Sequence, residues 1–298
     1  MQEYIVEIGN ERIDTYLAKL MGVSRSKIGK MLENNILVNE IKVKNSYMVK
    51  VNDKIEVTDY IEENLNLQAE DMNLDIVYED DDVMVINKAN GVVVHPAIGN
   101  SCHTLVNGLI HHSKNLSSKN GEFRPGIVHR IDAYTTGLLM VAKNDEAHDF
   151  LAKQLSKKTV HRKYVALVWG VINNDTGTID APIGRDPRDR KKMAVTADNS
   201  KEAVTHFKVI KRFKEVTLIE LKLETGRTHQ IRVHMNYIGY PVVNDPVYGK
   251  RKLIDTTGQC LHALELGFIH PKTKEYMEFT SQLPSCFTTI LSKFEEEL

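Results

Sequence analysis

Cysteine and long apolar runs are scarce in this sequence. The three cysteines, Cys102, Cys260 and Cys286, are odd in number and widely spaced, which fits reduced thiols better than a disulfide framework or a zinc knuckle. No window approaches the roughly 18 apolar residues of a membrane span, and the opening MQEYIVEIGNER is acidic where a signal peptide has an apolar core. We therefore expect a cytoplasmic protein that does not enter a membrane.

Common catalytic signatures are also missing. The sequence contains no G-x-x-x-x-G-K followed by Ser or Thr and no G-x-G-x-x-G, so phosphate-cradling loops lack their usual signal. It contains neither the H-E-x-x-H of zincin proteases nor the G-x-S-x-G of serine hydrolases. His229 and His234 are five residues apart, which places them on different sides of a helix rather than on one metal-binding face. A metal site built from His95 and Asp132 has no supporting pattern, so we expect no metal.

Charge is segregated along the chain although its sum is small. Residues 59–82 contain ten acidic residues and no Lys or Arg, and because the whole chain carries -1, the remainder must carry +9. Such segregation suits a surface that binds an anionic partner. Residues 59–75, with few aromatic residues and no periodicity, read as an acidic linker that stays extended.

Residues 12–58 have the pattern of a small separate domain. RIDTYLAKLMGV has apolar residues at helical spacing, and Ser24 is a plausible N-cap of a second helix. The polar face of that second helix carries Arg25, Lys27 and Lys30. From composition alone, these charges fit a solvated surface as well as a binding surface. ILVNEIKV and DKIEVTDY then predict short strands.

This small domain resembles the RNA-binding module of the small-subunit ribosomal protein called S-four, which also occurs in many RNA-modifying enzymes. The resemblance covers RIDTYLAKLMGVSRSKIGKMLENNILVN followed by DKIEV. It implies that Ser24, Arg25, Lys27 and Lys30 face RNA.

The rest of the chain, residues 76–298, reads as strand-rich. DVMVINKANGVVVHP predicts two strands broken at Asn90-Gly91, and GLLMVAK, KYVALVWG, EAVTHFKVIKRF and EVTLIELKLETG predict further strands. NDEAHDFLAKQLSKK and THQIRVHMNYIG predict helices. We therefore expect an α+β fold, in which helices pack on a mixed, mostly antiparallel sheet behind the small N-terminal domain.

Two segments of this second domain are dense in polar residues. RPGIVHRIDAYTTGLLMVAK and LETGRTHQIRVHMNYIGYPVVNDPVYG each place Arg, His and a carboxylate or amide at the end of an apolar strand, where side chains are held rigidly beside a cleft. We expect Thr135-Thr136-Gly137 to form the turn between Asp132 and its strand. A purely structural reading, in which Asp132 caps a turn and the arginines solubilise strand ends, explains one segment more easily than both.

A catalytic Asp132 would need a cationic partner, because burying an unpaired carboxylate costs several kcal/mol, on the order of 5. The second segment offers Arg227 and Arg232. On a helix from Thr228 to Tyr237, His229 and Arg232 share one face, whereas Arg227 precedes the helix. Spacing alone does not choose between the two arginines.

The second domain also resembles a known family. HRIDAYTTGLLMVAK resembles the H-R-L/I-D-x-x-T-S/T-G-L-L-x-x-A-K motif of the RluA/RluD family of pseudouridine synthases, and GRTHQIRVHMNYIGYPVVNDPVYG resembles their second long motif. NKANGVVVHP, RKYVALVWG and CLHALELGFIHP follow the order of the family. The resemblance spans essentially the whole chain, and with the leading module the layout is similar to the RluC/RluD type.

This resemblance implies an enzyme that detaches uracil from ribose within RNA, turns it and rejoins it through carbon 5. The essential carboxylate would be Asp132, which acts on the sugar or the base by a route that the sequence leaves open. Arg232 would pair with it, and Tyr164 would stack on the base or take a proton, unless it is a core aromatic. Arg130 would fill the gap that the extruded base leaves. His129 and Arg227 would support the loop or contact phosphate.

The resemblance further implies RNA as the partner, most naturally large-subunit ribosomal RNA or its precursor particle, bound by a monomer. An isomerisation exchanges no electrons and transfers no phosphate, so we expect no cofactor. Two alternatives stay open, a non-catalytic RNA-binding or ribosome-assembly protein on the same fold and a ribosyl hydrolase. Departures from the family pattern occur at Ala89, Ala133, Tyr134 and Asn244, and the sequence does not identify the target uridine.

Overall fold

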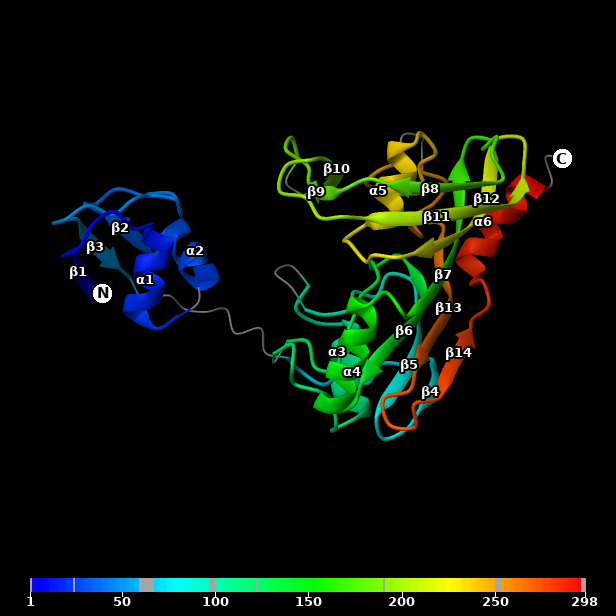
Figure 1. The fold of residues 1–298 in the computed structure, drawn as a ribbon, viewed down its shortest axis with the longest axis horizontal. Coiled ribbons are helices and arrows are strands. Elements are labelled where there is room, and N and C mark those ends of the chain that lie inside the picture. The colour runs from blue at the N-terminus through cyan, green and yellow to red at the C-terminus, as the bar shows by residue number, and fades with distance from the viewer. Residues whose placement is uncertain are drawn as a thin grey trace. The chain divides into compact units, whose positions relative to one another are not determined.

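A computed structural model of the chain (Figure 1) describes residues 2–23, 25–58, 67–96, 100–121, 123–189, 191–249 and 253–295. The chain divides into two compact units, residues 1–64 and 65–298. This boundary falls inside the predicted linker, residues 59–75, of which 59–66 lie outside the described residues. None of the helices in the described ranges has the length and apolar character needed to cross a membrane.

The smaller unit packs two helices on a three-stranded antiparallel sheet of order β1-β3-β2. Its elements are β1 (Gln2–Ile5), α1 (Ile13–Met21), α2 (Arg25–Asn34), β2 (Ile36–Val38) and β3 (Lys54–Val57). Helix α1 ends where Gly22 takes a left-handed conformation, φ 66°. The strand predicted for ILVNEIKV stops early, because Asn39 and Glu40 both have positive φ and turn the chain back. The spacing predicts most of the buried face of both helices, with Ile13, Leu17 and Ile28 fully buried, but Leu20 at the end of α1 is exposed.

A buried carboxylate ties the two helices of the smaller unit together. Asp14, 5% exposed, accepts hydrogen bonds from Arg12 Nε at 3.0 Å and Nη2 at 2.9 Å, and from Arg25 Nη2 at 2.9 Å. The Arg12 hydrogen bond, helped by Arg25, holds the pKa of Asp14 well below its usual 3.8. Part of the Arg25 charge, which the sequence assigned to RNA, is therefore engaged within the unit.

We predict that Asp14→Asn lowers the stability of the smaller unit at neutral pH by about 1–2 kcal/mol. Because the folded pKa is depressed, the contribution of Asp14 is fully present above the usual 3.8 and is lost as pH falls further. The wild type should therefore lose stability progressively below about pH 4, and the variant should lose less. Hydrogen exchange of the α1 amides measures this, and equal pH dependence in both proteins would contradict it.

The larger unit is built on a mixed sheet of order β4-β5-β6-β13-β7-β12-β11-β8, with β14 also paired to β13 (Figure 1). The pair β6 and β13 is parallel and the other pairs in this sheet are antiparallel. Its strands are β4 (Ile76–Glu79), β5 (Val83–Lys88), β6 (Thr136–Ala142), β7 (His161–Trp169), β8 (Thr176–Asp180), β11 (Val204–Arg212), β12 (Val216–Leu223), β13 (Leu261–Ile269) and β14 (Tyr276–Thr280). The expected mixed, mostly antiparallel sheet is confirmed.

Within the described residues of the larger unit, four helices and a small ribbon complete the fold. The helices are α3 (Leu105–His112), α4 (Asp145–Ser156), α5 (Gln230–Tyr237) and α6 (Ser285–Glu295), and the ribbon pairs β9 (Ile183–Arg185) with β10 (Met193–Val195). Helix α4 covers the β6 region through Ala147 and Leu151. Residues 67–75 are held on this unit, since Glu70 N–H donates to Asn107 O at 3.0 Å and Leu74 packs on the core. The acidic segment is therefore anchored over its second half.

The second strand predicted after Asn90-Gly91 does not form. Its backbone serves helix α3 instead, because Val93 O and Val94 O accept hydrogen bonds from Leu105 N–H at 2.8 Å and Val106 N–H at 3.1 Å. These carbonyls satisfy donors at the helix N-terminus that have no intrahelical partner. The prediction was wrong because the pattern of apolar side chains does not show that the backbone carbonyls of this segment accept hydrogen bonds from the N-terminus of α3.

The turn before β6 lies earlier than the sequence suggested. Thr135 N–H donates to Asp132 O at 3.0 Å, which closes a turn over Asp132–Thr135, and β6 already begins at Thr136. Gly137, at φ 104°, lies within the strand, where a Cβ would come 2.3 Å from Ala263 O of the parallel neighbour β13. Glycine is needed here because only it permits this approach. As a result, Asp132 is held directly at the end of a buried strand.

Candidate active site

Asp132 and Arg232, one hundred residues apart, meet in the larger unit. Arg232 Nη1 donates to Asp132 Oδ2 at 3.0 Å, and the Asp132 side chain is 16% exposed. Spacing left Arg227 and Arg232 open as partners, and the structure pairs Asp132 with Arg232. Arg227 Nε instead donates to Glu202 O at 2.8 Å.

Arg232 is oriented by a second carboxylate, which the sequence reasoning missed. Its Nε and Nη2 donate to Asp245 Oδ2 and Oδ1 at 2.7 and 2.9 Å, a bidentate pair that fixes the guanidinium plane. Asp245 Oδ1 also accepts the N–H groups of Val247 and Tyr248. Burial would raise the pKa of Asp245, but the Arg232 hydrogen bonds hold it below its usual value. The third nitrogen of Arg232 is therefore aimed at Asp132.

His229 forms a third contact to Asp132. Its Nε2 lies 3.8 Å from Asp132 Oδ1, and its Nδ1 lies 2.9 Å from the Tyr248 hydroxyl. That hydroxyl accepts Met193 N–H at 2.9 Å, so its own proton is free to be donated to Nδ1. Burial lowers the pKa of His229, partly opposed by Asp132. We assign a neutral ring with its proton on Nε2, facing Asp132.

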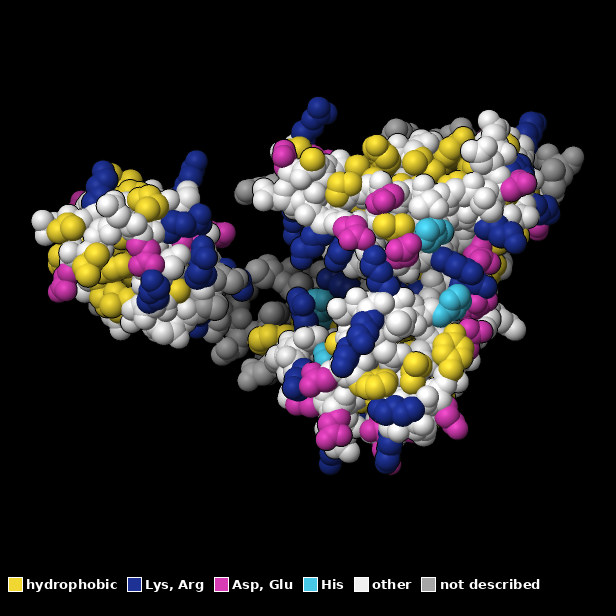
Figure 2. Space-filling view, in the orientation of Figure 1, with side chains coloured by type: hydrophobic (Ala, Val, Ile, Leu, Met, Phe, Trp, Pro, Cys, Tyr) yellow, Lys and Arg dark blue, Asp and Glu magenta, His cyan; other side chains and the backbone are white. Residues whose placement is uncertain are grey.

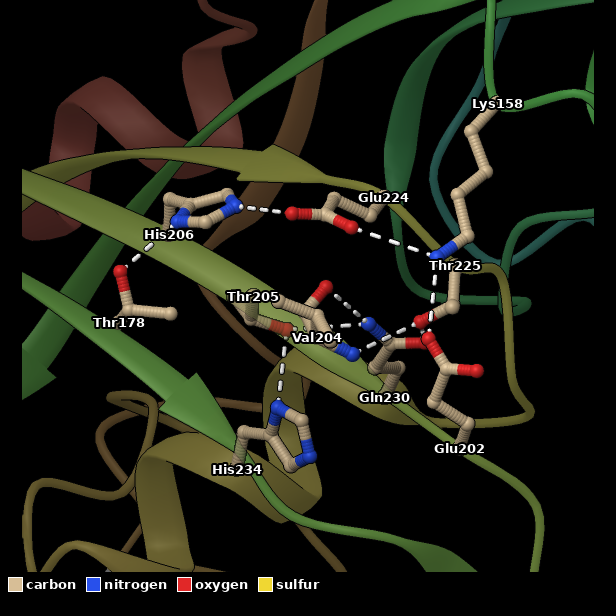
Figure 3. A network of polar contacts seen from close by, with 10 residues as sticks. All are labelled: Lys158, Thr178, Glu202, Val204, Thr205, His206, Glu224, Thr225, Gln230 and His234. Carbon is tan, nitrogen blue, oxygen red and sulfur yellow. Dashed lines mark hydrogen bonds and ion pairs between the residues drawn. The ribbon is translucent and has the colours of Figure 1, made fainter.

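Helix α5, which carries Arg232, is fastened to the sheet by polar side chains (Figure 3). Gln230 Nε2 donates to Val204 O and Thr205 Oγ1, both at 3.0 Å, and its Oε1 accepts from Thr225 Oγ1 at 2.8 Å. One turn later, His234 Nδ1 lies 2.9 Å from Thr205 Oγ1. These buried bonds set the position and rotation of the helix, and hence of Arg232.

The expected face of α5 is confirmed, although the helix is shorter than predicted. It begins at Gln230 rather than Thr228, because His229 takes a left-handed conformation, φ 57°, at the N-cap. This conformation is uncommon for a side chain larger than glycine and clusters at functional sites. It leaves His229 and Arg232 on the same side, both directed at Asp132.

These groups line a pocket of about 610 Å³, counted with its open mouth. Asp132, Tyr164 and Arg232 all line it, as do Arg130 and Arg227. On the face shown in Figure 2, Lys and Arg side chains gather along a hollow in the larger unit. Most of the residues that the sequence singled out in this unit therefore share one basic cavity.

Tyr164 forms part of the buried wall of the pocket. It is 6% exposed on β7, and burial raises the pKa of its phenol, an effect that Arg162 opposes. The ring is therefore neutral at physiological pH. Tyr164 is at once a core aromatic, packed with Leu221 and Ala263, and a pocket residue, so the two readings of the sequence are compatible.

Arg130, His129 and Arg227 have different environments. Arg130 is exposed and lines the pocket. His129 Nε2 accepts Met140 N–H at 3.1 Å, and burial, with a smaller effect of Arg162, lowers its pKa to about 3. His129 is therefore a neutral ring that ties the Asp132 loop to β6. Arg227 is half-buried and lines the cavity.

Lys88 is a buried cation beside the Asp132 turn that the sequence did not flag. It is 2% exposed, and its Nζ donates to Ala89 O, Val92 O and Ala133 O at 2.8, 2.9 and 2.7 Å. Burial lowers the pKa of Lys88 to about 7, and the charge of Asp132 opposes this. Three carbonyl acceptors match the three donors of an ammonium group. Lys88 thereby fixes the residue that follows Asp132.

We predict that Lys88→Met lowers the free energy of unfolding by about 2–4 kcal/mol, because three carbonyls lose their donor. Urea unfolding measures this loss. The control is Lys222→Met, since Lys222 is exposed on β12. Unchanged stability in Lys88→Met would contradict the assigned role.

The departures from the family pattern have local explanations. Asn244 takes φ 61°, a conformation that Asn tolerates, and its Oδ1 accepts the N–H groups of Ile254 and Asp255 at 2.8 and 3.2 Å. Tyr134 is 42% exposed and lies on Gly258, where an added Cβ would come 2.4 Å from its ring. Ala89 supplies a carbonyl to Lys88. None of these contacts displaces the Asp132–Arg232 pair.

The predicted RNA-facing residues of the smaller unit are only partly described. Ser24 lies outside the described residues. Arg25 is exposed while paired to Asp14, Lys27 is half-buried, and Lys30 is exposed on α2. Helix α2 thus presents the charges of Arg25 and Lys30 to solvent, and Arg25 is at the same time paired with Asp14.

Among the described residues, Asp80, Asp82 and His270 come close enough together to hold a metal ion. The hydrogen bonds argue against it, because His270 Nδ1 accepts the N–H groups of Lys272 and Thr273 at 3.2 and 3.1 Å. The ring proton must then lie on Nε2, which faces Asp80 Oδ2 at 2.8 Å. A metal bound to Nε2 would require the ring proton on Nδ1, but Nδ1 already accepts hydrogen bonds from the N–H groups of Lys272 and Thr273. The cluster is a hydrogen-bonded turn.

Comparison with family models gives two matches. A model described as RNA pseudouridylate synthase matches residues 82–237, and one described as S4 domain matches residues 11–55. The first match contains Asp132, Tyr164 and Arg232 and ends before Asp245.

Relatives are similar over nearly the full chain. The uncharacterized RNA pseudouridine synthase YlyB of Bacillus subtilis is 54% identical over 96% of this chain and 95% of its own length. The ribosomal large subunit pseudouridine synthase D of Neisseria meningitidis serogroup B is 43% identical over 96% of this chain and 79% of its own. A solved structure, human RNA pseudouridylate synthase domain containing 1, superposes with a TM-score of 0.60 and 26% identity, covering 76% of this chain and 96% of that one.

Proposed function

The chain belongs to the RNA pseudouridine synthase family, and from this premise we propose that it converts specific uridines of large-subunit ribosomal RNA to pseudouridine, with Asp132 as the essential carboxylate. The observation that carries the proposal is the Asp132–Arg232–Asp245 chain at the wall of a basic pocket. The relative from Neisseria, named for the large ribosomal subunit, supports this RNA as substrate.

The arrangement of charges suits the isomerisation. Arg232 holds Asp132 in one orientation with its second oxygen, Oδ1, directed toward His229. A carboxylate so fixed can attack the sugar or the base, or handle a ribose proton. The neutral His229 and Tyr164 can donate hydrogen bonds or pass protons within the pocket. The reaction rearranges bonds within one nucleotide and exchanges no electrons, so these side chains suffice in principle.

Access of a uridine to this pocket requires base extrusion. A base that stays stacked in folded RNA does not reach a half-buried carboxylate in a pocket, and unstacking costs about a few kcal/mol. Arg130, exposed and two residues before Asp132, is the side chain that we assign to the vacated stack, since its planar guanidinium can stack on bases. Arg227 and the α2 cations Arg25, Lys27 and Lys30 would contact phosphates and position the RNA.

The proposal is tested with unmodified large-subunit ribosomal RNA that carries tritium at carbon 5 of its uracils, with tritiated transfer RNA as the comparison. Forming the new carbon–carbon bond expels the hydrogen at carbon 5, so the enzyme should release tritium from the ribosomal RNA. Release from transfer RNA alone would reassign the substrate. No release despite tight binding would favour a non-catalytic binding or assembly protein.

A further inference from the structure

Arg162 is a buried cation in the pocket wall that has no partner among the residues that the structure describes. It is 9% exposed on β7 and lines the cavity, and its Nε is enclosed without an acceptor. Across the part of the chain that the structure describes, no hydrogen bond or ion pair engages its guanidinium. Arg232, in the same pocket, pairs with two carboxylates.

An enclosed donor without an acceptor is costly to a folded protein, because Nε of Arg162 has given up water without a compensating partner. Buried polar groups nearly always have an acceptor or donor, and an exception calls for an explanation. The simplest explanation is that the acceptor arrives with the substrate. Arg162 can supply up to five donors in a fixed plane to such an acceptor.

The position of Arg162 indicates which part of the RNA that acceptor belongs to. Arg162 and Tyr164 are two residues apart on β7, so their side chains leave the same face of the sheet. Both are buried in the pocket wall, whereas Arg130 is exposed and Arg227 half-buried. Because the RNA chain continues on both sides of the target, its phosphates stay near the mouth. The extruded base is the part that reaches the buried wall.

We propose that Arg162 donates a hydrogen bond to a carbonyl oxygen of the extruded uracil and stabilises the negative charge that this oxygen gains during the reaction. The inference rests on the proposed function. If the glycosidic bond breaks as Asp132 bonds to carbon 1 of the sugar or a ribose proton is removed, its electron pair stays on nitrogen 1 and is shared with oxygens 2 and 4. If Asp132 instead adds to carbon 6, the π electron pair between carbons 5 and 6 moves to oxygen 4. The negative charge on uracil disappears when carbon 5 bonds to the sugar and any bond to Asp132 breaks; carbon 5 then releases its proton to solvent, and nitrogen 1 takes up a proton. Arg162 thus serves each route as a preorganised donor.

The neighbouring Gly226 leaves room for this guanidinium. A Cβ at Gly226 would lie 2.9 Å from Arg162 Nη1, so any other residue there would displace the side chain. The backbone of Gly226 does not need positive φ, and the clash is with the end of a flexible side chain. Gly226→Ala should therefore fold normally while moving Nη1.

The test uses single-turnover tritium release from ribosomal RNA tritiated at uracil carbon 5, together with RNA affinity and its salt dependence. Arg162→Met should slow release about 100-fold with affinity changed less than about threefold. Arg162→Lys, which keeps the charge, should recover part of the rate, and Gly226→Ala should lose about tenfold. The control is Lys222→Met. Lys222 lies opposite Lys163 in the register of β12 and β7, so its side chain is on the face of the sheet away from Tyr164, and this variant should match the wild type.

Stability separates this role from a structural one. Because the protein leaves Arg162 unpaired, Arg162→Met should melt at the same temperature as the wild type or higher. A lower melting temperature with equal loss of rate would overturn the proposal in favour of a packing role. Weaker binding with a shallower salt dependence and an unchanged rate would overturn it in favour of a phosphate contact. If the wild type itself releases no tritium, the proposed function fails; if Arg162→Met is as active as the wild type, only this inference fails.

Discussion

Asp132→Asn is expected to abolish pseudouridine formation, by more than about 10⁴-fold, because the amide can neither attack nor accept a proton as the carboxylate does. RNA binding should stay within about threefold, since Asp132 contributes no positive charge to the phosphate contacts. The fold should persist, because Arg232 keeps its bidentate pair with Asp245. Tritium release and filter binding measure the two effects.

The matched control for this change is Asp149→Asn. Asp149 is an exposed carboxylate on α4, outside the pocket. It should show wild-type rate and affinity. Residual activity in Asp132→Asn above about 1% of the wild-type rate would remove Asp132 from the chemical step, because losses at a catalytic carboxylate are far larger.

Arg232→Met is expected to damage both stability and catalysis. It leaves the carboxylate of Asp245, whose side chain is 0% exposed, without its partner, and breaking such a buried pair costs about 3–5 kcal/mol. The rate should fall by about 10³-fold because Asp132 loses its orientation. Arg232→Lys should recover little, since an ammonium cannot bridge both carboxylates in one plane. Urea unfolding and tritium release measure the two losses.

A double variant separates these losses. Arg232→Met with Asp245→Asn removes the stranded charge, so it should regain much of the stability without regaining activity. If the double variant recovered the rate along with the stability, the role of Arg232 would be confined to folding. If Arg232→Met were fully stable, the buried pair would not have the assigned energetic role.

Part of the candidate site was predictable from residues close together in sequence, and the resemblance to the family added Tyr164 and the choice of Arg232. Asp132 lies within three residues of His129 and Arg130, and the helical spacing of His229 and Arg232 already placed both on one face. Local periodicity encodes such relations, and the structure brings these groups together. Choosing Arg232 over Arg227 from the residues alone was impossible, because that choice depends on how α5 docks against the sheet.

The missed residues depend on contacts between distant segments. Asp245 orients Arg232 only because a turn after α5 returns to the helix, and Lys88 reaches Ala133 across 45 positions. In sequence, Arg162 belongs to the basic cluster of residues 157–163, which fits a phosphate-contact surface or ordinary solvated charge, and only the folded structure shows that its side chain is buried with an enclosed Nε. The sequence did carry one signal for Asp245, its place in the polar run N-D-P-V-Y-G. Register and burial, which decide the others, are properties of the folded chain.

Nucleoside analysis of the treated ribosomal RNA distinguishes isomerisation of uridine in the Asp132 pocket from cleavage of its glycosidic bond. For every tritium released from carbon 5, we expect one pseudouridine in the RNA and no free uracil in solution. Free uracil with abasic sites would contradict this expectation and identify a ribosyl hydrolase.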